Sequence, residues 1–185
     1  MRTLLSFLAL LLLAGPAGAQ EALMRALAGG GHVAIMRHSL APGTGDPPNF
    51  RLGDCATQRN LSDGGRNDAR TTGRRLKQAG LKPGAVLSSP WCRCLETARL
   101  LDLGPVQQSD ALAQVNTDGS NRGQIVAAMR MLIGGLDRTG PSTVMVTHQT
   151  NIAALTDVQT ESGEIVVLKL EPGGRFSVAG KIPPP

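Results

Sequence analysis

The sequence predicts an α/β fold: a three-layer sandwich whose mainly parallel central sheet is flanked by helices. Short apolar runs of strand length alternate along the chain with longer segments of helical periodicity. Most of these runs are continuously apolar, as is typical of strands buried on both faces. Near the C-terminus, two strand-like segments flank Pro172-Gly173-Gly174, which predicts a closing antiparallel hairpin.

The elements are expected to follow one another in a simple alternation. Helices are predicted at residues 21–27, 62–80, 89–101, 121–132 and 151–155. Strands are predicted at residues 32–36, 85–88, 106–107, 142–146, 164–170 and 175–179. Residues 39–60 are rich in Gly, Pro, Asp and Asn and are expected to form a long loop, and long loops in compact domains are usually functional.

Local signals indicate where the helices begin and which faces they bury. Ser62 and Ser89 are each placed to cap a helix, and Pro90 stands at the first helical position, where its missing N–H costs nothing. Four small or apolar residues recur at helical spacing along the first long helix and predict its buried face. These residues are Ala69, Gly73, Leu76 and Gly80.

The first 19 residues have the layout of a cleavable secretory signal peptide. Arg2 supplies a positive charge, residues 4–14 are apolar, and Ala17-Gly18-Ala19 precede the expected cleavage point. The apolar run is short for a membrane-spanning helix, which needs about 20 residues, so an uncleaved anchor is the less favoured alternative. Residues 20–185 would then form one domain, periplasmic or secreted, with no stable membrane insertion after cleavage.

The formal net charge of +5 favours affinity for anions. Aromatic residues make up only 2% of the chain and Tyr is absent, so the base-stacking platforms of nucleic-acid-binding proteins are missing. We therefore expect no nucleic-acid partner. Arg66, Arg70 and Arg74 share one face of a predicted helix, which we interpret as a solvated basic surface rather than an anion-attracting edge.

The chain has three cysteines, Cys55, Cys92 and Cys94. An oxidising compartment permits a disulfide, and Cys92 and Cys94 are too close in sequence to pair easily with each other. Cys55 is therefore expected to pair with one of them, with Cys94 slightly preferred. A zinc site is disfavoured, because this spacing and the absence of a nearby His do not match the usual ligand sets.

Three short polar motifs each follow a predicted strand directly: Arg37-His38, Ser88–Arg93 and Thr147-His148. Ligands of open α/β sheets bind at the carboxyl ends of the strands, so these motifs are expected to meet at one rim. Their basic side chains are two guanidiniums and two imidazoles. This set suits a tetrahedral oxyanion, because Arg matches phosphate geometry and keeps its charge.

The same motifs resemble those of the histidine phosphatase superfamily. Met36-Arg37-His38-Ser39 is similar to its Arg-His-Gly signature, Ser89–Ala98 to Ser-Pro-x-x-Arg-x-x-x-Thr-Ala, and Thr147–Asn151 to Thr-His-x-x-Asn. The resemblance covers nearly all of residues 20–185. It looks closest to small periplasmic members, which include phosphatases acting on phosphohistidine or on envelope sugar phosphates.

The resemblance implies a phosphatase that forms a phosphohistidine on His38, which water then hydrolyses. Arg37, Arg93 and His148 would bind the phosphoryl oxygens, and Thr44 would donate a hydroxyl where the family often has Asn. His38 must present a neutral ring nitrogen, so its other nitrogen is expected to donate to a backbone carbonyl. No metal or cofactor is expected. The partner would be a small phosphorylated substrate or a phosphohistidine-bearing protein.

Departures from the family pattern concern Ser39, which replaces Gly, and the proton donor. Gln114 and Gln149 stand where the two branches of the family place an acid, and the acids nearby in sequence are Asp110 and Asp118. Without an acid, good leaving groups such as the imidazole of phosphohistidine are favoured over alkoxides. The alternative function is a catalytically weak phosphate- or phosphosugar-binding protein on the same fold.

Overall fold

The computed structural model describes residues 16–185, so most of the predicted signal peptide lies outside the described residues. The first element, α1 (Pro16–Ala28), is longer than the predicted helix and includes the expected cleavage point. Signal-peptide cleavage therefore stays a prediction. Within residues 16–185, no helix is both long and apolar enough to cross a membrane.

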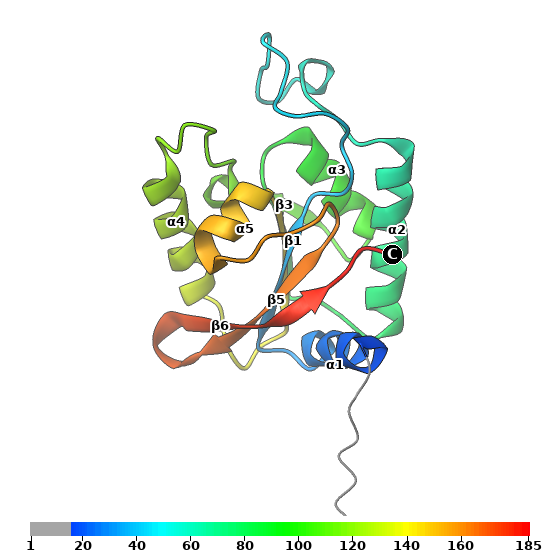
Figure 1. Ribbon diagram of the computed structural model, residues 1–185. Coiled ribbons are helices and arrows are strands. Elements are labelled where there is room, and N and C mark those ends of the chain that lie inside the picture. Colours follow the sequence, from blue (N-terminus) through cyan, green and yellow to red (C-terminus); the bar gives the residue numbers. More distant parts are fainter. Residues whose placement is uncertain (1–15) are drawn as a thin grey trace, which may run out of the picture.

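The fold is α/β with one mixed six-stranded sheet of order β3-β2-β4-β1-β5-β6, which confirms the predicted class (Figure 1). β1 and β2 each pair with β4 in parallel, and β3 extends the sheet in parallel beside β2. β5 is antiparallel to β1 and forms the predicted hairpin with β6. The strands are β1 (His32–Arg37), β2 (Ala85–Ser88), β3 (Val106–Gln108), β4 (Thr143–Thr147), β5 (Ile165–Glu171) and β6 (Arg175–Ile182).

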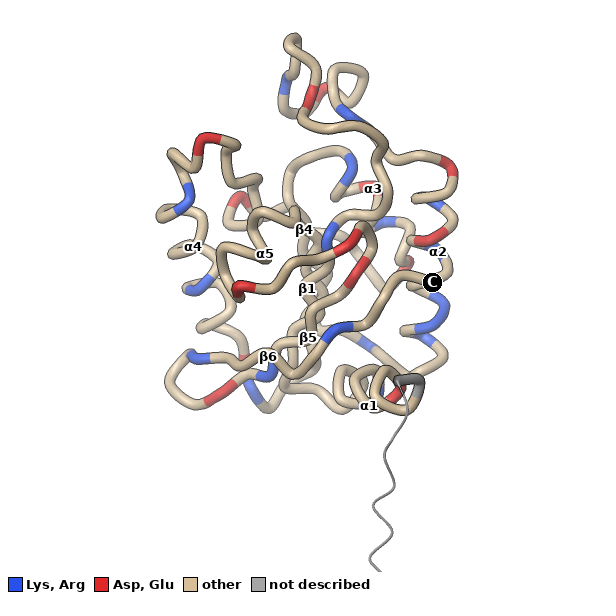
Figure 2. The backbone as a smooth tube through the Cα atoms, in the orientation of Figure 1, with Lys and Arg blue, Asp and Glu red and all other residues tan. Residues whose placement is uncertain are grey.

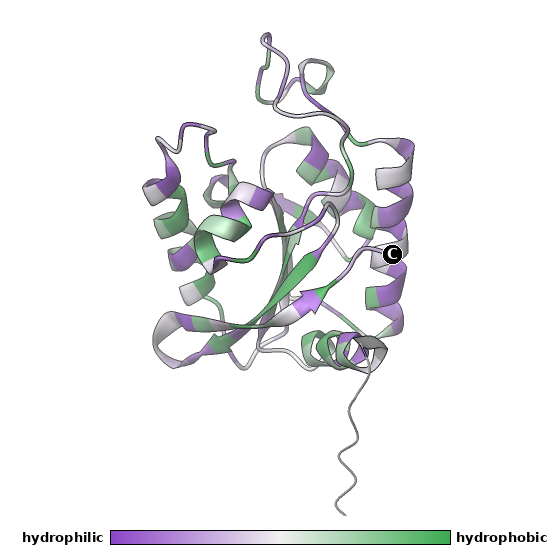
Figure 3. Ribbon diagram, in the orientation of Figure 1, coloured by the Kyte–Doolittle hydropathy of each residue, from purple (hydrophilic) through white to green (hydrophobic). Residues whose placement is uncertain are grey.

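Helices cover both faces of the sheet, so its central strands are buried on both sides. Alternate β1 residues enter different cores: Ala34 and Met36 pack with α1, α2 and α3, whereas Val33 and Ile35 pack with α4 and α5. Figure 3 shows these apolar strands between helices with more hydrophilic outer surfaces. The other helices are α2 (Asp63–Gln78), α3 (Cys92–Leu101), α4 (Arg122–Gly134) and α5 (Gln149–Thr156), with short 3-10 turns at Cys55–Thr57, Asp110–Leu112 and Pro172–Gly174.

α2 packs closely against α3 through the buried face that the sequence predicts. Ala69, Gly73 and Leu76 are buried, and a Cβ on Gly73 would lie only 2.1 Å from the backbone oxygen of Leu101. The prediction that Gly80 shares this face is wrong. Gly80 is exposed and adopts φ of 88° just after the helix, a conformation that glycine allows at a helix end.

The N-terminus of α2 is capped by a side chain, and the outer face of the helix is basic. The Ser62 side chain accepts a hydrogen bond from the Gly65 N–H at 3.0 Å, as its predicted capping role requires. Figure 2 shows Lys and Arg residues distributed along the whole of α2. Arg66 forms an ion pair with Glu96 of α3, whereas Arg70 and Arg74 are exposed.

A disulfide joins Cys55, in the loop of residues 39–60, to Cys92 at the start of α3. The slight preference for Cys94 as the partner of Cys55 is wrong. Positions two apart on a helix point to different sides, so Cys92 meets the loop while Cys94 faces the sheet. Cys94 is a fully buried free thiol, and burial raises its pKa to about 12.

Candidate active site

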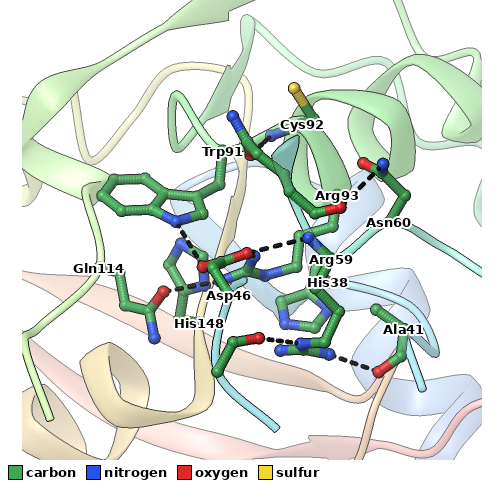
Figure 4. Close-up of polar contacts among 12 residues, drawn as sticks. His38, Ala41, Asp46, Arg59, Asn60, Trp91, Cys92, Arg93, Gln114 and His148 are labelled. Atoms are coloured by element: carbon green, nitrogen blue, oxygen red, sulfur yellow. Dashed lines mark hydrogen bonds and ion pairs between the residues drawn. The ribbon is translucent and has the colours of Figure 1, made fainter. Parts of the chain in front are cut away.

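The exits of three neighbouring strands meet at one rim, as the sequence predicts. β4 lies between β1 and β2, and backbone hydrogen bonds continue past the strand ends. The His38 N–H donates to the Thr147 carbonyl, and the Ser89 N–H donates to the Val146 carbonyl, both at 2.9 Å. The His38 and His148 rings consequently lie 5.6 Å apart, centroid to centroid (Figure 4).

A hydrogen bond to the Ser39 carbonyl fixes the tautomer of the His38 ring. Its Nδ1 lies 2.8 Å from the Ser39 carbonyl, and a carbonyl can only accept, so Nδ1 carries the proton and Nε2 keeps its lone pair. The ring is 3% exposed, and burial, aided by the charge of Arg93, lowers its pKa to about 3. His38 is therefore neutral at physiological pH with Nε2 unprotonated, as a nucleophile requires.

Ser39 fits the position where the family pattern has Gly. Among the described residues other than glycine, only Asp102 and Asp157 have positive φ, so the backbone at Ser39 does not demand glycine. The Ser39 N–H donates to Thr97 Oγ1 at 3.1 Å. This hydrogen bond ties the segment that follows β1 to α3 and orients the carbonyl that accepts from His38.

Two arginines, the fully buried Arg93 and the half-buried Arg37, present unsatisfied donors at the rim. Arg93, in the first turn of α3 and fully buried, donates to Asp46 Oδ1 at 2.7 Å and to Gln114 Oε1 at 2.6 Å. Arg37 donates to the Thr160 carbonyl at 2.8 Å. Within residues 16–185, the buried Nε of each arginine finds no hydrogen-bond partner. Buried donors are normally satisfied, so these two indicate a site for an anionic ligand.

His148 is fixed by side chains below the rim. Its Nε2 lies 2.9 Å from Ser89 Oγ and 3.6 Å from Cys94 Sγ, and burial lowers its pKa well below the ordinary value. The prediction that Ser89 caps the helix is therefore corrected: Ser89 bonds His148, and α3 begins only at Cys92. The Cys92 N–H instead donates to Gln58 Oε1 at 2.9 Å, so the long loop supplies the cap.

Two further charged residues, Asp46 and Arg59, enter the site from the loop of residues 39–60. Arg59 donates from Nε to the Gly45 carbonyl at 2.8 Å and from its guanidinium to the Ala41 carbonyl. Asp46 accepts from the Arg59 N–H at 3.0 Å and from Trp91 Nε1 at 3.2 Å, as well as from Arg93 (Figure 4).

Sequence reasoning missed both residues, although loop length indicated that the segment is functional. Thr44, the residue predicted from this loop, is exposed instead. Burial alone would raise the pKa of Asp46, but hydrogen bonds from the Arg59 N–H and the Arg93 guanidinium lower it below its ordinary value. Asp46 is therefore ionised at neutral pH and serves poorly as a proton donor in this state.

The rim surrounds a small cavity of about 80 Å³, lined by residues that include Arg37, His38, Arg59, Gln114 and His148. With both imidazoles neutral, the three guanidiniums outweigh the Asp46 carboxylate, so the cavity is positively charged. Within residues 16–185, no group of three or more His, Cys, Asp or Glu side chains could hold a metal ion. The arrangement can bind a tetrahedral oxyanion against an unprotonated imidazole nitrogen.

The glutamines at the expected acid positions have hydrogen-bonding roles. Gln114 accepts from Arg93, and Gln149 donates to Gln159. Asp110 and Asp118 are both exposed, and Asp118 lines a second cavity of about 450 Å³ next to the first. Asp46, in contact with Arg93, is thus the carboxylate that the structure brings to the rim.

Comparisons with known proteins find a matching family model and similar folds. Residues 35–124 match the model of the histidine phosphatase superfamily (branch 1). The structure is similar to that of the protein histidine phosphatase SixA complexed with tungstate, at 20% identity and a TM-score of 0.59 over 81% of this chain and 95% of that one.

A second similar structure is a mycobacterial glucosyl-3-phosphoglycerate phosphatase, at 18% identity and a TM-score of 0.61 over 80% of this chain and 97% of that one. A third is the product of an open reading frame from Mycobacterium tuberculosis, at 17% identity and a TM-score of 0.61 over 80% and 94% of the two chains. At these identities the likeness concerns the fold. No curated protein matches the sequence.

Proposed function

We propose that this chain is a member of the histidine phosphatase superfamily and hydrolyses a phosphorylated substrate through a phosphohistidine on His38. The observation that carries the proposal is the neutral, buried His38, whose Nδ1 proton is fixed by the Ser39 carbonyl and whose Nε2 is unprotonated. His38 lines the small, positively charged cavity. A site that only binds phosphate has no need of such a nucleophile.

In the first step, the lone pair of His38 Nε2 attacks phosphorus, and the bond from phosphorus to the leaving group breaks. The leaving group departs with the bonding electron pair and takes up a proton from water. Arg37, Arg59 and Arg93 donate hydrogen bonds to the phosphoryl oxygens, with a further contact from His148. In the second step, water attacks the phosphohistidine, which releases inorganic phosphate and restores His38. The guanidiniums supply the positive charge, so the proposal requires no metal.

The substrate is proposed to have a good leaving group. Gln114 and Gln149 cannot protonate a departing group as a carboxylic acid does, and Asp46 is held in its ionised form. Phosphoramidates such as phosphohistidine, and acyl or aryl phosphates, depend least on such protonation. The similarity to a protein histidine phosphatase supports this choice.

A periplasmic or secreted location is part of the proposal. It is supported by the signal-like sequence of residues 1–19 and by the disulfide between Cys55 and Cys92, because structural disulfides persist in oxidising compartments. The lack of a carboxylic acid at residue 114 favours a second candidate, a phosphate- or phosphosugar-binding protein with little turnover.

Hydrolysis of an aryl phosphate by the chain from Gln20 onward, with a metal chelator present, tests the proposal. We expect turnover that survives chelation and is lost in His38→Ala. The matched control is His32→Ala, because His32 contacts the Gly30 carbonyl outside the site. Equal activity in His38→Ala would overturn the mechanism. Tight phosphate binding without turnover on aryl phosphates or phosphohistidine would favour the binding protein.

A further inference from the structure

The cavity of about 450 Å³ beside the proposed phosphoryl site has a lining of a different kind. Gln114 borders both cavities, and Asp46, which lines the larger one, contacts Arg93 at 2.7 Å. A substrate with its phosphoryl group against His38 would therefore extend its leaving group past Gln114 into the larger cavity. This placement of the leaving group rests on the proposed function, in which the phosphoryl group lies against His38.

The sign of the charge reverses from one cavity to the other. The smaller cavity is lined by Arg37 and Arg59, whereas the residues of 16–185 that line the larger one include no Lys, Arg or His. The larger cavity instead contains the carboxylates of Asp46 and Asp118. Asp118 is exposed, and its pKa is lowered by the hydrogen bond that it accepts from the Ser120 N–H.

Uncharged groups complete the lining of the larger cavity. Trp91 and Phe50 stack on each other, with ring centroids 5.6 Å apart and planes 18° from parallel, and form an aromatic wall. The amides of Gln114 and Asn116 provide both donors and acceptors. This lining suits a leaving group that has an apolar or aromatic surface together with neutral or cationic polar groups.

We propose that the larger cavity binds the leaving group and selects substrates whose leaving group has no negative charge. A second phosphate or a carboxylate would lie beside Asp118, and the cavity lining offers no cation to compensate it, because the nearby Arg93 is already paired with Asp46. Like charges at short range repel strongly. Bisphosphates and phosphorylated carboxylic acids are consequently poor substrates. Among good leaving groups, neutral or cationic ones, such as an imidazole or an uncharged phenol, are the accepted class.

A pair of aryl phosphates that differ in one charge tests this selectivity: 4-carbamoylphenyl phosphate and 4-carboxyphenyl phosphate. The measured quantity is the ratio of their kcat/KM values in the wild type, in Asp118→Asn and in Asp118→Lys. Intrinsic differences in reactivity cancel, because the same two substrates are compared in every protein. Asp118→Asn keeps a side-chain oxygen for the Ser120 N–H and removes only the charge.

We expect the preference for the amide substrate to fall modestly in Asp118→Asn and by about tenfold or more in Asp118→Lys, because a cation would then face the carboxylate. The matched control is Asp137→Lys, which makes the same change in a similar turn, where Asp137 accepts from the Thr139 N–H, before β4 and away from the site. Its ratio should equal that of the wild type.

The outcomes separate this inference from the function on which it rests. Turnover of both substrates with the same ratio in the wild type and Asp118→Lys would overturn the charge selection and leave the phosphatase proposal standing. A wild type that prefers the carboxylate substrate would overturn it as well, once the intrinsic reactivities of the two phosphates are accounted for. Failure to hydrolyse either substrate would contradict the proposed function itself, and the inference would fall with it.

Discussion

Removal of the disulfide between Cys55 and Cys92 should destabilise the protein strongly. The two residues are 37 positions apart, and the double variant Cys55→Ser, Cys92→Ser frees that length of chain in the unfolded state. For a loop of this length, the chain-entropy model gives a loss of about 4 kcal/mol in the free energy of unfolding. In a domain of this size, that loss corresponds to a fall of roughly 8–16 °C in Tm.

The same change should weaken the site, because the disulfide holds a loop that supplies site residues. Arg59 follows Cys55 closely, and Gln58 accepts a hydrogen bond from the Cys92 N–H itself. Thermal unfolding by circular dichroism, with and without reductant, measures the effect on stability. Reductant should lower the Tm of the wild type towards that of the double variant and leave the variant unchanged, because its remaining thiol, Cys94, is already unpaired. A double variant that unfolds within about 2 °C of the oxidised wild type would refute this reasoning.

Three more predictions concern protonation, packing and phosphate binding. Burial lowers the pKa of His38 to about 3 and that of His148 well below its ordinary value. An imidazole NMR titration should therefore show both of these rings neutral from pH 7 to about 5. A protonation transition of the His38 or the His148 ring near pH 6.5 would contradict this prediction. Histidines of the unfolded chain bind protons below about pH 6.5 while these two do not, so the free energy of unfolding should fall as the pH falls through that range. Gly73→Ala places a Cβ 2.1 Å from a backbone oxygen of α3 and should cost about 3 kcal/mol or more in urea denaturation. Gly64→Ala, on the same helix, places a Cβ at an ordinary contact distance of 3.7 Å from Ser62 Oγ and should be neutral or stabilise by about 0.5–1 kcal/mol. Arg93→Lys should lower kcat/KM by about 100-fold, because one ammonium cannot hold Asp46 and Gln114 and also bind phosphate; a loss of less than about threefold would contradict that role.

The parts that sequence reasoning predicted correctly depend on local patterns. Continuous apolar runs identified the central strands, and the turn at Pro172-Gly173-Gly174 identified the closing hairpin. The strand ends placed Arg37, His38, Arg93 and His148 at one rim, because carboxyl ends of parallel strands meet at the same edge. The Nδ1 contact of His38 with a backbone carbonyl was also predictable, since a nucleophilic imidazole must keep one nitrogen unprotonated.

The parts that it missed depend on the path of the long loop. Asp46 and Arg59 are brought to Arg93 by that loop, whose course is fixed by the disulfide and by contacts distant in sequence. The choice of Cys92 over Cys94 follows from the rotation of α3 about its axis, which composition and spacing do not reveal. Ser89 is a good capping residue by type, but the proximity of His148 gives its hydroxyl a different partner.

The central claim is that the phosphoryl group is transferred to His38 before water releases it as phosphate. Capture of the phosphohistidine intermediate tests this claim most directly. The protein would be mixed with a phosphoramidate or aryl phosphate, quenched within milliseconds in alkali, where phosphohistidine survives, and analysed by peptide mass spectrometry. We predict one phosphoryl group on the peptide that contains His38, absent from His38→Ala. Steady hydrolysis of the substrate with no phosphoryl group on His38 at any time point, or with the label on another residue, would contradict the account.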